Sequence, residues 1–214
     1  MMRHGWRWAL LAAAALAAGS ALLAAAHRAG PLWGEDGAVR WLQARTGSPE
    51  AARIIRWMTS TEPVTVAGLL AAAAGWRRGA VRFAIVTAVL FAALPVVQSG
   101  LKELADRPRP APPTVELRAG ASSPSFPAGH VMSGLVGYGW AAVTATRSRL
   151  PRVARAGCTL CCAAIIGASA WANLWTGVHW PTDIAGGFAW GTVMVSAGAA
   201  AWRPERRRTN GRAS

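Results

Sequence analysis

Long apolar stretches separated by short polar segments dominate the chain. Six of them cover residues 8–26, 57–76, 81–101, 130–146, 157–175 and 183–202. Most approach the roughly 20 residues that a helix needs to cross a bilayer. The pattern therefore predicts an all-α, polytopic integral membrane protein with six transmembrane helices.

The first stretch has a second interpretation. Basic residues precede it and the small-residue run Ala24-Ala25-Ala26 ends it, as in a secretory signal peptide. Its apolar part is longer than the core of a usual signal peptide, so we expect a retained helix. In either case the chain emerges on the same side of the membrane.

A further helix start is predicted in the polar segment before the second stretch. Ser48 is a suitable N-cap, and Pro49 suits the first helical position because its missing N–H costs nothing there. Residues 51–58, with Arg53 and Arg56, then either lie on the membrane interface or lead into the second span.

Composition supports the membrane class. Apolar residues make up 53% of the chain and charged residues 15%. The net charge is +14, which in a soluble protein would suggest nucleic-acid binding. Here the cations gather in short loops and at the C-terminus, so membrane topology explains them and we expect no nucleic-acid partner.

The loop cations alternate onto one face of the six-helix arrangement. They are Arg3, Arg7, Arg77, Arg78, Arg82, Arg147, Arg149, Arg152, Arg155, Arg203, Arg206, Arg207 and Arg208. An excess of Lys and Arg marks the cytoplasmic side. We therefore predict a bacterial-type plasma-membrane protein with both termini in the cytoplasm, including a basic tail over 203–214.

Three polar clusters fall on the opposite, extracytoplasmic face. They cover residues 102–110, 127–130 and 179–183. Together they hold fixed cations, two imidazoles and a carboxylate. Such groups can bind a phosphate and attack it.

The third cluster pairs an imidazole with a carboxylate. Pro181 suits the first turn of a helix, which places His179 just before that helix and Asp183 on its first turn. A carboxylate bound to one imidazole nitrogen fixes the tautomer and leaves the other nitrogen more nucleophilic. The alternative is a solvated His and Asp at the membrane interface.

The other clusters supply an acid and cations. His130 opens the fourth stretch and is a candidate general acid, and Gly129 allows close backbone approach to an anion. The alternative for His130 is a solvated loop histidine. Arg109 offers bidentate phosphate contact and Lys102 a mobile charge, unless they are only an outer-loop charge run.

The clusters resemble the signature of the type 2 phosphatidic acid phosphatase (PAP2) family, which is Lys-x6-Arg-Pro, Pro-Ser-Gly-His and Ser-Arg-x5-His-x3-Asp. Residues 102–110 satisfy the first motif in full. The second is kept except that Ala128 replaces Ser, and the third ends correctly on His179 and Asp183. The resemblance covers residues 57–202, leaving 1–56 as a first transmembrane helix and outer loop.

The resemblance implies a PAP2-like helical bundle that hydrolyses a membrane lipid phosphate or isoprenoid diphosphate. Substrates would be of the phosphatidic acid, phosphatidylglycerol phosphate or undecaprenyl diphosphate type. His179 would attack and form a phosphohistidine, Asp183 would orient it, and His130 would protonate the leaving group. The expected phosphate-binding residues are Lys102, Arg109, Gly129 and Asn173, with Arg107 and Asp106 as support. No metal or cofactor is implied.

Departures at the start of the third motif leave alternatives open. Its Ser-Arg pair falls on Ala172 and Asn173, which removes one fixed positive charge, although Asn173 can donate a hydrogen bond and Arg107 could partly substitute. Losing a comparable oxyanion donor typically lowers a rate by ~10²–10³-fold. A weak or inactive protein that binds lipid phosphates is therefore the second hypothesis. The predicted spans argue against a haloperoxidase, and the ligand spacing argues against a zinc hydrolase.

Overall fold

The computed structural model describes residues 5–45 and 47–202, and within these ranges the chain forms eight helices and no strand. The all-α prediction is confirmed. The helices are α1 (Gly5–Ala26), α2 (Glu35–Gln43), α3 (Pro49–Met58), α4 (Thr61–Arg77), α5 (Val81–Ala105), α6 (Gly129–Thr146), α7 (Arg152–Trp175) and α8 (Pro181–Ala201). The predicted basic tail and Arg3 lie outside the described residues.

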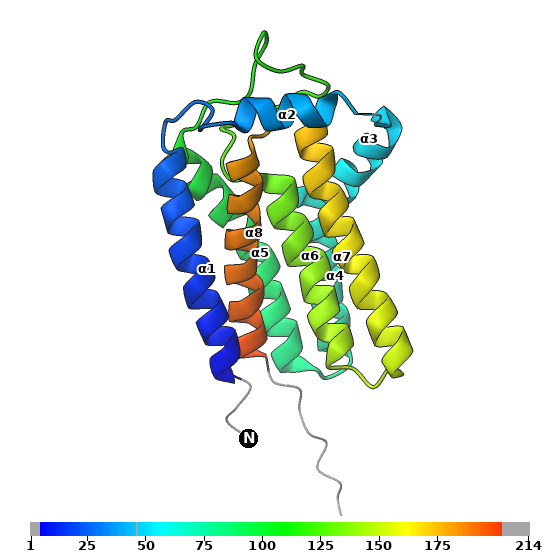
Figure 1. Cartoon of the computed structure of the whole chain (residues 1–214). Helices are drawn as coiled ribbons and strands as arrows, with labels where there is room; N and C mark the ends of the chain where they lie inside the picture. Colours follow the sequence, from blue (N-terminus) through cyan, green and yellow to red (C-terminus); the bar gives the residue numbers. More distant parts are fainter. Residues whose placement is uncertain (1–4, 46, 203–214) are drawn as a thin grey trace, which may run out of the picture.

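The long helices run alternately up and down in one bundle (Figure 1). Helix α1 packs along α8, α4 packs along α5, and α6 lies between α7 and α8. The apolar core between them includes Leu94, Met132, Val136 and Trp140, which are almost completely buried. Because successive long helices alternate in direction, the segments that follow α1, α5 and α7 meet at the upper end in Figure 1.

Membrane character is clearest in four helices. Among the described residues, α1, α5, α7 and α8 are long and apolar enough to cross a membrane. Helix α4 has 17 residues, and polar residues interrupt the apolar run of α6. The prediction of a membrane protein is supported, whereas the count of six spans stays a prediction.

The second apolar stretch does not begin where the sequence predicted. Helix α3 ends at Met58 and α4 begins at Thr61. The hydroxyls of Thr59 and Ser60 donate hydrogen bonds to the carbonyls of Ile55 and Trp57 near the end of α3, which competes with continuation of the helix. The predicted start of α3 is confirmed, since Ser48 Oγ accepts a hydrogen bond from Ala51 N at 3.1 Å. Helix α3 is therefore a separate element, packed against α7 at the upper end.

Helix α2 was not predicted. It lies across the upper end of the bundle (Figure 1) and buries Glu35, Val39 and Gln43 on one face. Gln43 donates from Nε2 to the carbonyls of Glu116 and Trp175 at 2.7 and 3.2 Å. Helix α2 thus connects the loop after α5 to the end of α7.

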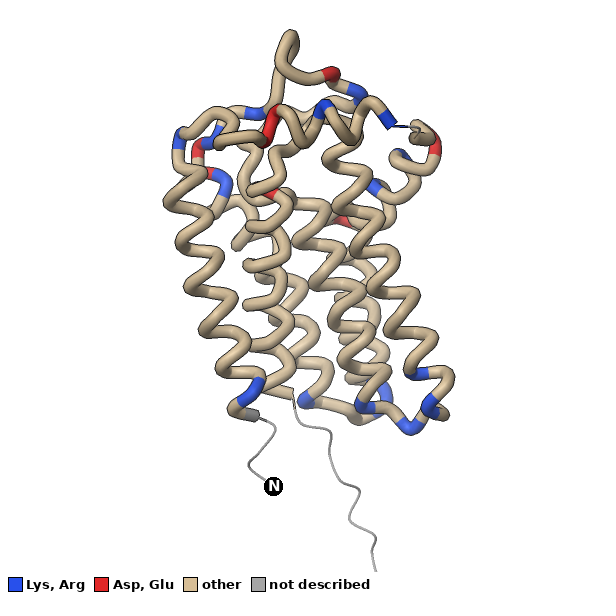
Figure 2. The backbone as a smooth tube through the Cα atoms, in the orientation of Figure 1, with Lys and Arg blue, Asp and Glu red and all other residues tan. Residues whose placement is uncertain are grey.

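Charge separates the two ends of the bundle (Figure 2). The lower end carries Lys and Arg only, whereas every Asp and Glu that the structure describes belongs to a segment of the upper end. The three polar clusters also lie at the upper end, where α5 ends and where α6 and α8 begin. The predicted grouping of the clusters on one face therefore matches the arrangement of the helices.

Candidate active site

A cavity of about 300 Å³ lies at the upper end of the bundle, where four helices and two loops meet. Its lining residues are Arg56, Thr61, Gln98, Lys102, Arg109, Gly120, Ala121, Ser122, Ser123, Gly129, His130 and His179. Residues from all three predicted clusters are thus brought to one site. Three of the lining side chains are cationic and none is acidic, so the cavity is suited to an anion.

His179 lies in the short connection between α7 and α8 and is 2% exposed. Its Nδ1 lies 3.5 Å from Asp183 Oδ2, an ion-pair distance at which no hydrogen bond is formed, and Nδ1 has no other partner within the described residues. Its Nε2 lies 3.4 Å from Arg109 Nη1. A proton on Nδ1 would face Asp183 and leave the lone pair of Nε2 on the Arg109 side.

Two hydrogen-bond donors hold the Asp183 carboxylate. As predicted, α8 begins with Pro181, and Asp183 lies on its first turn, where Oδ2 accepts from Trp180 N at 2.8 Å. Its Oδ1 accepts from Arg107 Nη1 at 2.7 Å. Both side chains of that ion pair are 0% exposed, so the carboxylate behind His179 is fixed in a dry environment.

Arg107 links Asp183 to helix α2. Its Nη2 lies 2.5 Å from Glu35 Oε2, and its other donors reach the carbonyls of Ala29 and Gly30. Because its donors are all engaged there, Arg107 does not line the cavity and cannot replace a phosphate-binding cation. Its predicted role as support matches this geometry.

His130 and Gly129 open helix α6, as predicted, and both line the cavity. A polar network fixes this turn, since Gln98 Nε2 donates to Gly129 O at 3.1 Å and to Ser133 Oγ at 2.7 Å. Thr61 Oγ1 in turn donates to Gln98 Oε1 at 2.7 Å. The first turn of α6 therefore presents an imidazole and free backbone N–H groups to the cavity.

Lys102 and Arg109 are held against the loop before α6. Lys102 Nζ donates to Pro124 O at 2.7 Å. Arg109 donates to Ser123 O and to Val178 O, each at 2.6 Å. The second of these contacts joins the loop after α5 to the residue before His179.

Besides Arg107 and Asp183, other predicted or motif residues also lie outside the cavity lining. Asn173 is fully buried and its amide donates to Ser169 O at 2.8 Å. Asp106 is exposed and forms a 3.7 Å ion pair with Arg28. Ala128 and Ala172 are buried in apolar clusters, where neither points a functional group at an anion.

Arg56 is the main residue that sequence reasoning missed as part of the site. It lies in the last turn of α3, lines the cavity, and donates from Nη1 to Asn173 Oδ1 at 2.5 Å. The only sequence signal was a basic residue on a helix predicted near the membrane interface. The segment 120–123, which has no charged side chain, was also missed.

Burial is the main cause of the pKa shifts of site residues in the loops and in α3. Burial, followed by the charge of Arg109, lowers the pKa of Arg56 to about 10. Burial also lowers the pKa of Arg109, although Asp183 opposes the shift. For His179, burial lowers the pKa to about 4, against the opposing effect of Asp183, so the imidazole is neutral at pH 7.

The structure offers little for a metal ion. Within the part of the chain that is described, no three His, Cys, Asp or Glu side chains come together to hold one. The cavity contributes two histidines, but three cationic side chains surround them and would repel a metal ion.

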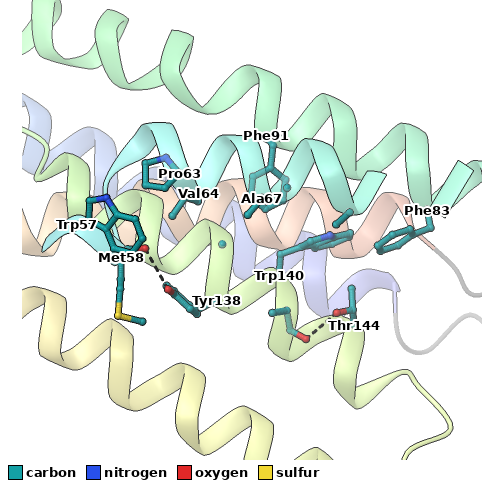
Figure 3. Close-up of a pocket in the computed structure, with 14 residues that line it drawn as sticks. Trp57, Met58, Pro63, Val64, Ala67, Phe83, Phe91, Tyr138, Trp140 and Thr144 are labelled. Atoms are coloured by element: carbon teal, nitrogen blue, oxygen red, sulfur yellow. Dashed lines mark hydrogen bonds between the residues drawn. The ribbon is translucent and has the colours of Figure 1, made fainter. Parts of the chain in front are cut away.

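A second, apolar pocket of about 570 Å³ lies between α3, α4, α5 and α6 (Figure 3). Trp57 and Met58 stand at one end, near Tyr138, whose hydroxyl donates to Met58 O at 3.2 Å. Phe83 and Trp140 stand at the other end. Trp57 directly follows Arg56, so α3 contributes to both pockets.

Comparisons with known proteins agree with the geometry. The family model described as PAP2 superfamily matches residues 64–208. A solved structure titled "Crystal structure of the first transmembrane PAP2 type phosphatidylglycerolphosphate phosphatase from Bacillus subtilis" is similar, with a TM-score of 0.72 and 19% identity, covering 87% of this chain and 93% of that chain. At that identity the likeness shows the fold. No curated protein matches the chain.

Proposed function

Because the chain belongs to the PAP2 superfamily, we propose that it is an integral membrane phosphatase that hydrolyses a lipid phosphate or isoprenoid diphosphate. The observation that carries the proposal is the cavity, in which three cations and two histidines converge and a buried carboxylate lies behind one histidine. The substrate would be of the phosphatidic acid, phosphatidylglycerol phosphate or undecaprenyl diphosphate type.

In the first step, the Nε2 lone pair of His179 attacks phosphorus while the bond from phosphorus to the leaving oxygen breaks. Asp183 holds the tautomer and stabilises the imidazolium that forms, as Arg107 keeps the carboxylate ionised and in place. His130 gives its proton to the leaving oxygen. The products are the dephosphorylated lipid and a phosphohistidine.

In the second step, water attacks the phosphohistidine. Neutral His130 takes a proton from the water, the phosphorus–nitrogen bond breaks, and His179 regains its lone pair. Lys102, Arg109 and the Gly129 backbone bind the phosphate oxygens, whose negative charge develops in both transition states. These steps need no metal or cofactor.

A lipid substrate is supported by the apolar pocket (Figure 3), to which α3 contributes as it does to the phosphate cavity. With Arg56 facing one pocket and Trp57 the other, a headgroup and its chain could occupy them together. Burial of apolar surface contributes about 25 cal/mol per Å². Such a pocket would therefore favour a lipid over a soluble phosphate ester.

We infer six transmembrane helices, with α4 and α6 completing the set that includes α1, α5, α7 and α8. The basic lower end supports a cytoplasmic location for both termini (Figure 2). The active site would then lie on the extracytoplasmic face of a bacterial-type plasma membrane. Residues 57–202 would form the phosphatase core, preceded by the first helix and outer loop over 1–56.

Phosphate release from purified protein in detergent tests the proposal. The substrates would be phosphatidic acid, phosphatidylglycerol phosphate and undecaprenyl diphosphate, with glycerol phosphate as the soluble control. We expect turnover of at least one lipid, loss of that turnover in His179→Ala, and far weaker turnover of glycerol phosphate. Absence of turnover for every lipid, or unchanged turnover in His179→Ala, would refute it.

A further inference from the structure

Arg56 is a cation without a counter-ion among the residues that the structure describes. It is half-buried beside Arg109, and within the described residues no carboxylate lies within 4.0 Å of it. Its Nη1 donates to Asn173 Oδ1 at 2.5 Å and approaches Thr176 Oγ1 at 3.5 Å. No partner inside the described ranges engages its Nε or Nη2. Withdrawing a cation from water without a partner is unfavourable, so an anion in the cavity would complete this arrangement.

Asn173 is poorly placed to bind that anion itself. Its side chain is fully buried and does not line the cavity. Its amide nitrogen donates to Ser169 O at 2.8 Å, while its amide oxygen accepts from Arg56. Both ends of the amide are therefore used inside the protein, and what they fix is the orientation of the guanidinium.

The contact joins two elements that are distant in sequence. Arg56 lies in the last turn of α3 and Asn173 in the last turn of α7, and these two helices pack together. An arginine side chain at position 173 would need the space that Arg56 now occupies at the edge of the cavity. An arginine at either position, 56 or 173, would thus place its guanidinium group at the same edge of the cavity.

We propose that Arg56 binds the phosphate group of the substrate and that Asn173 is the positioning residue that orients it. The proposal rests on the proposed function for the identity of the anion. Arg56 precedes the matched residues 64–208, so the missing charge at position 173 is supplied from a neighbouring helix. The cavity then holds a complete set of fixed cations, which removes the main reason to expect a weak or inactive protein.

The first test compares two arginines of helix α3. Removing one charged group that contacts the transition state typically lowers a rate by ~10²–10³-fold. We therefore expect Arg56→Ala to lower kcat by that range and to weaken inhibition by inorganic phosphate. Arg56→Lys should recover part of the loss, since charge is kept without the bidentate fork. Arg53→Ala, which removes an exposed arginine from the same helix, should leave both values unchanged.

The second test moves the cation. Asn173→Arg alone places two guanidinium groups in one space, so we expect lower activity than wild type. In the Arg56→Ala background the same change restores a cation, so Arg56→Ala/Asn173→Arg should exceed Arg56→Ala by about tenfold or more, part of the ~10²–10³-fold loss. A gain from Asn173→Arg in the wild-type chain would overturn the proposal, because it would show that the cation was still missing.

The positioning role of Asn173 has its own readout. Asn173→Ala should lower activity less than Arg56→Ala does, and should have no further effect once Arg56 is alanine, because coupled residues are not additive. Additive effects would overturn the positioning role. Wild-type kcat in Arg56→Ala, with His179→Ala inactive, would overturn the phosphate contact while leaving the proposed function standing.

Equilibrium binding separates the two hypotheses further. If the wild-type chain turned over no lipid, titration with inorganic phosphate, followed by ³¹P NMR, would still test the anion site. Phosphate binding that weakens in Arg56→Ala but not in Arg53→Ala supports the proposal. Equal binding in wild type and Arg56→Ala overturns it.

Discussion

Replacement of Arg107 by Met should destabilise the protein and impair the nucleophile. Arg107 and Asp183 are 0% exposed and Glu35 is 6% exposed, and the arginine contacts both carboxylates. Its removal leaves two buried carboxylates without their cation. Breaking a buried pair in this way costs about 3–5 kcal/mol. At about 2–4 °C per kcal/mol for a chain of this size, the apparent Tm should fall by roughly 6–20 °C.

The assay is thermal unfolding in detergent, followed by intrinsic tryptophan fluorescence, with phosphate release measured in parallel. Arg40→Met is the matched control, because it removes a solvent-screened i,i+4 pair with Asp36, and such surface pairs contribute little to stability. Arg107→Lys should retain little of the stability, since one ammonium cannot reproduce the two-sided contact. An Arg107→Met variant with a Tm within about 2 °C of wild type, less than one kcal/mol by the same conversion, would refute the reasoning.

Three other predictions follow from the geometry. Burial lowers the pKa of His179 to about 4, so its neutral, attacking form is present above that pH and is lost as pH falls through it. Histidine NMR of labelled protein, with the signal assigned by comparison with His179→Ala, should show titration near 4. Titration near the ordinary 6.5 would contradict the burial. Gly177→Ala should cost about 1–3 kcal/mol in stability, because Gly177 has φ +71° and a Cβ would overlap the Glu116 carbonyl; a wild-type Tm for this variant would be inconsistent with that turn. Gly68→Ala should slow turnover of long-chain lipids more than that of short-chain ones, because the new methyl would collide with the Phe91 ring and change the shape of the apolar pocket that both residues line. Equal effects on both chain lengths would argue against chain binding there.

Much of the site was accessible from the sequence because its residues sit at helix ends. His130 opens α6 and His179 precedes Pro181 at the start of α8, and both positions follow from local rules for helix starts. Alternation of the long helices then brings those ends to one side of the bundle. The apolar pattern gave the long helices to within a few residues for the same reason, since length and hydropathy are local properties.

What the sequence could not provide are contacts between elements that are distant along the chain. The partners Arg56 and Asn173 are 117 residues apart, and the partners Arg107 and Asp183 are 76 apart. Single-sequence patterns carry no information on such pairings. Helix α2 was missed because two of its three buried residues, Glu35 and Gln43, are polar, so its buried face has no apolar pattern. Glu35 can be buried because it pairs with Arg107.

The boundary between α3 and α4 was missed for a local reason. Apolar residues continue on both sides of Thr59 and Ser60, so the predicted stretch over 57–76 ran across them, with residues 51–58 expected either on the interface or leading into it. The two hydroxyls bind the carbonyls of Ile55 and Trp57 and end α3 there. Arg56 therefore lies in a separate helix, α3, and not in the span that begins at Thr61.

In the proposed reaction, His179 carries the phosphoryl group during hydrolysis. Its most direct test is rapid quenching of the enzyme with lipid substrate labelled with ³²P in the reacting phosphate, under alkaline, denaturing conditions that preserve phosphohistidine. We expect acid-labile label on the protein within a single turnover, located at His179 and absent from His179→Ala. Retained turnover in His179→Ala, or label on a different residue, would contradict it.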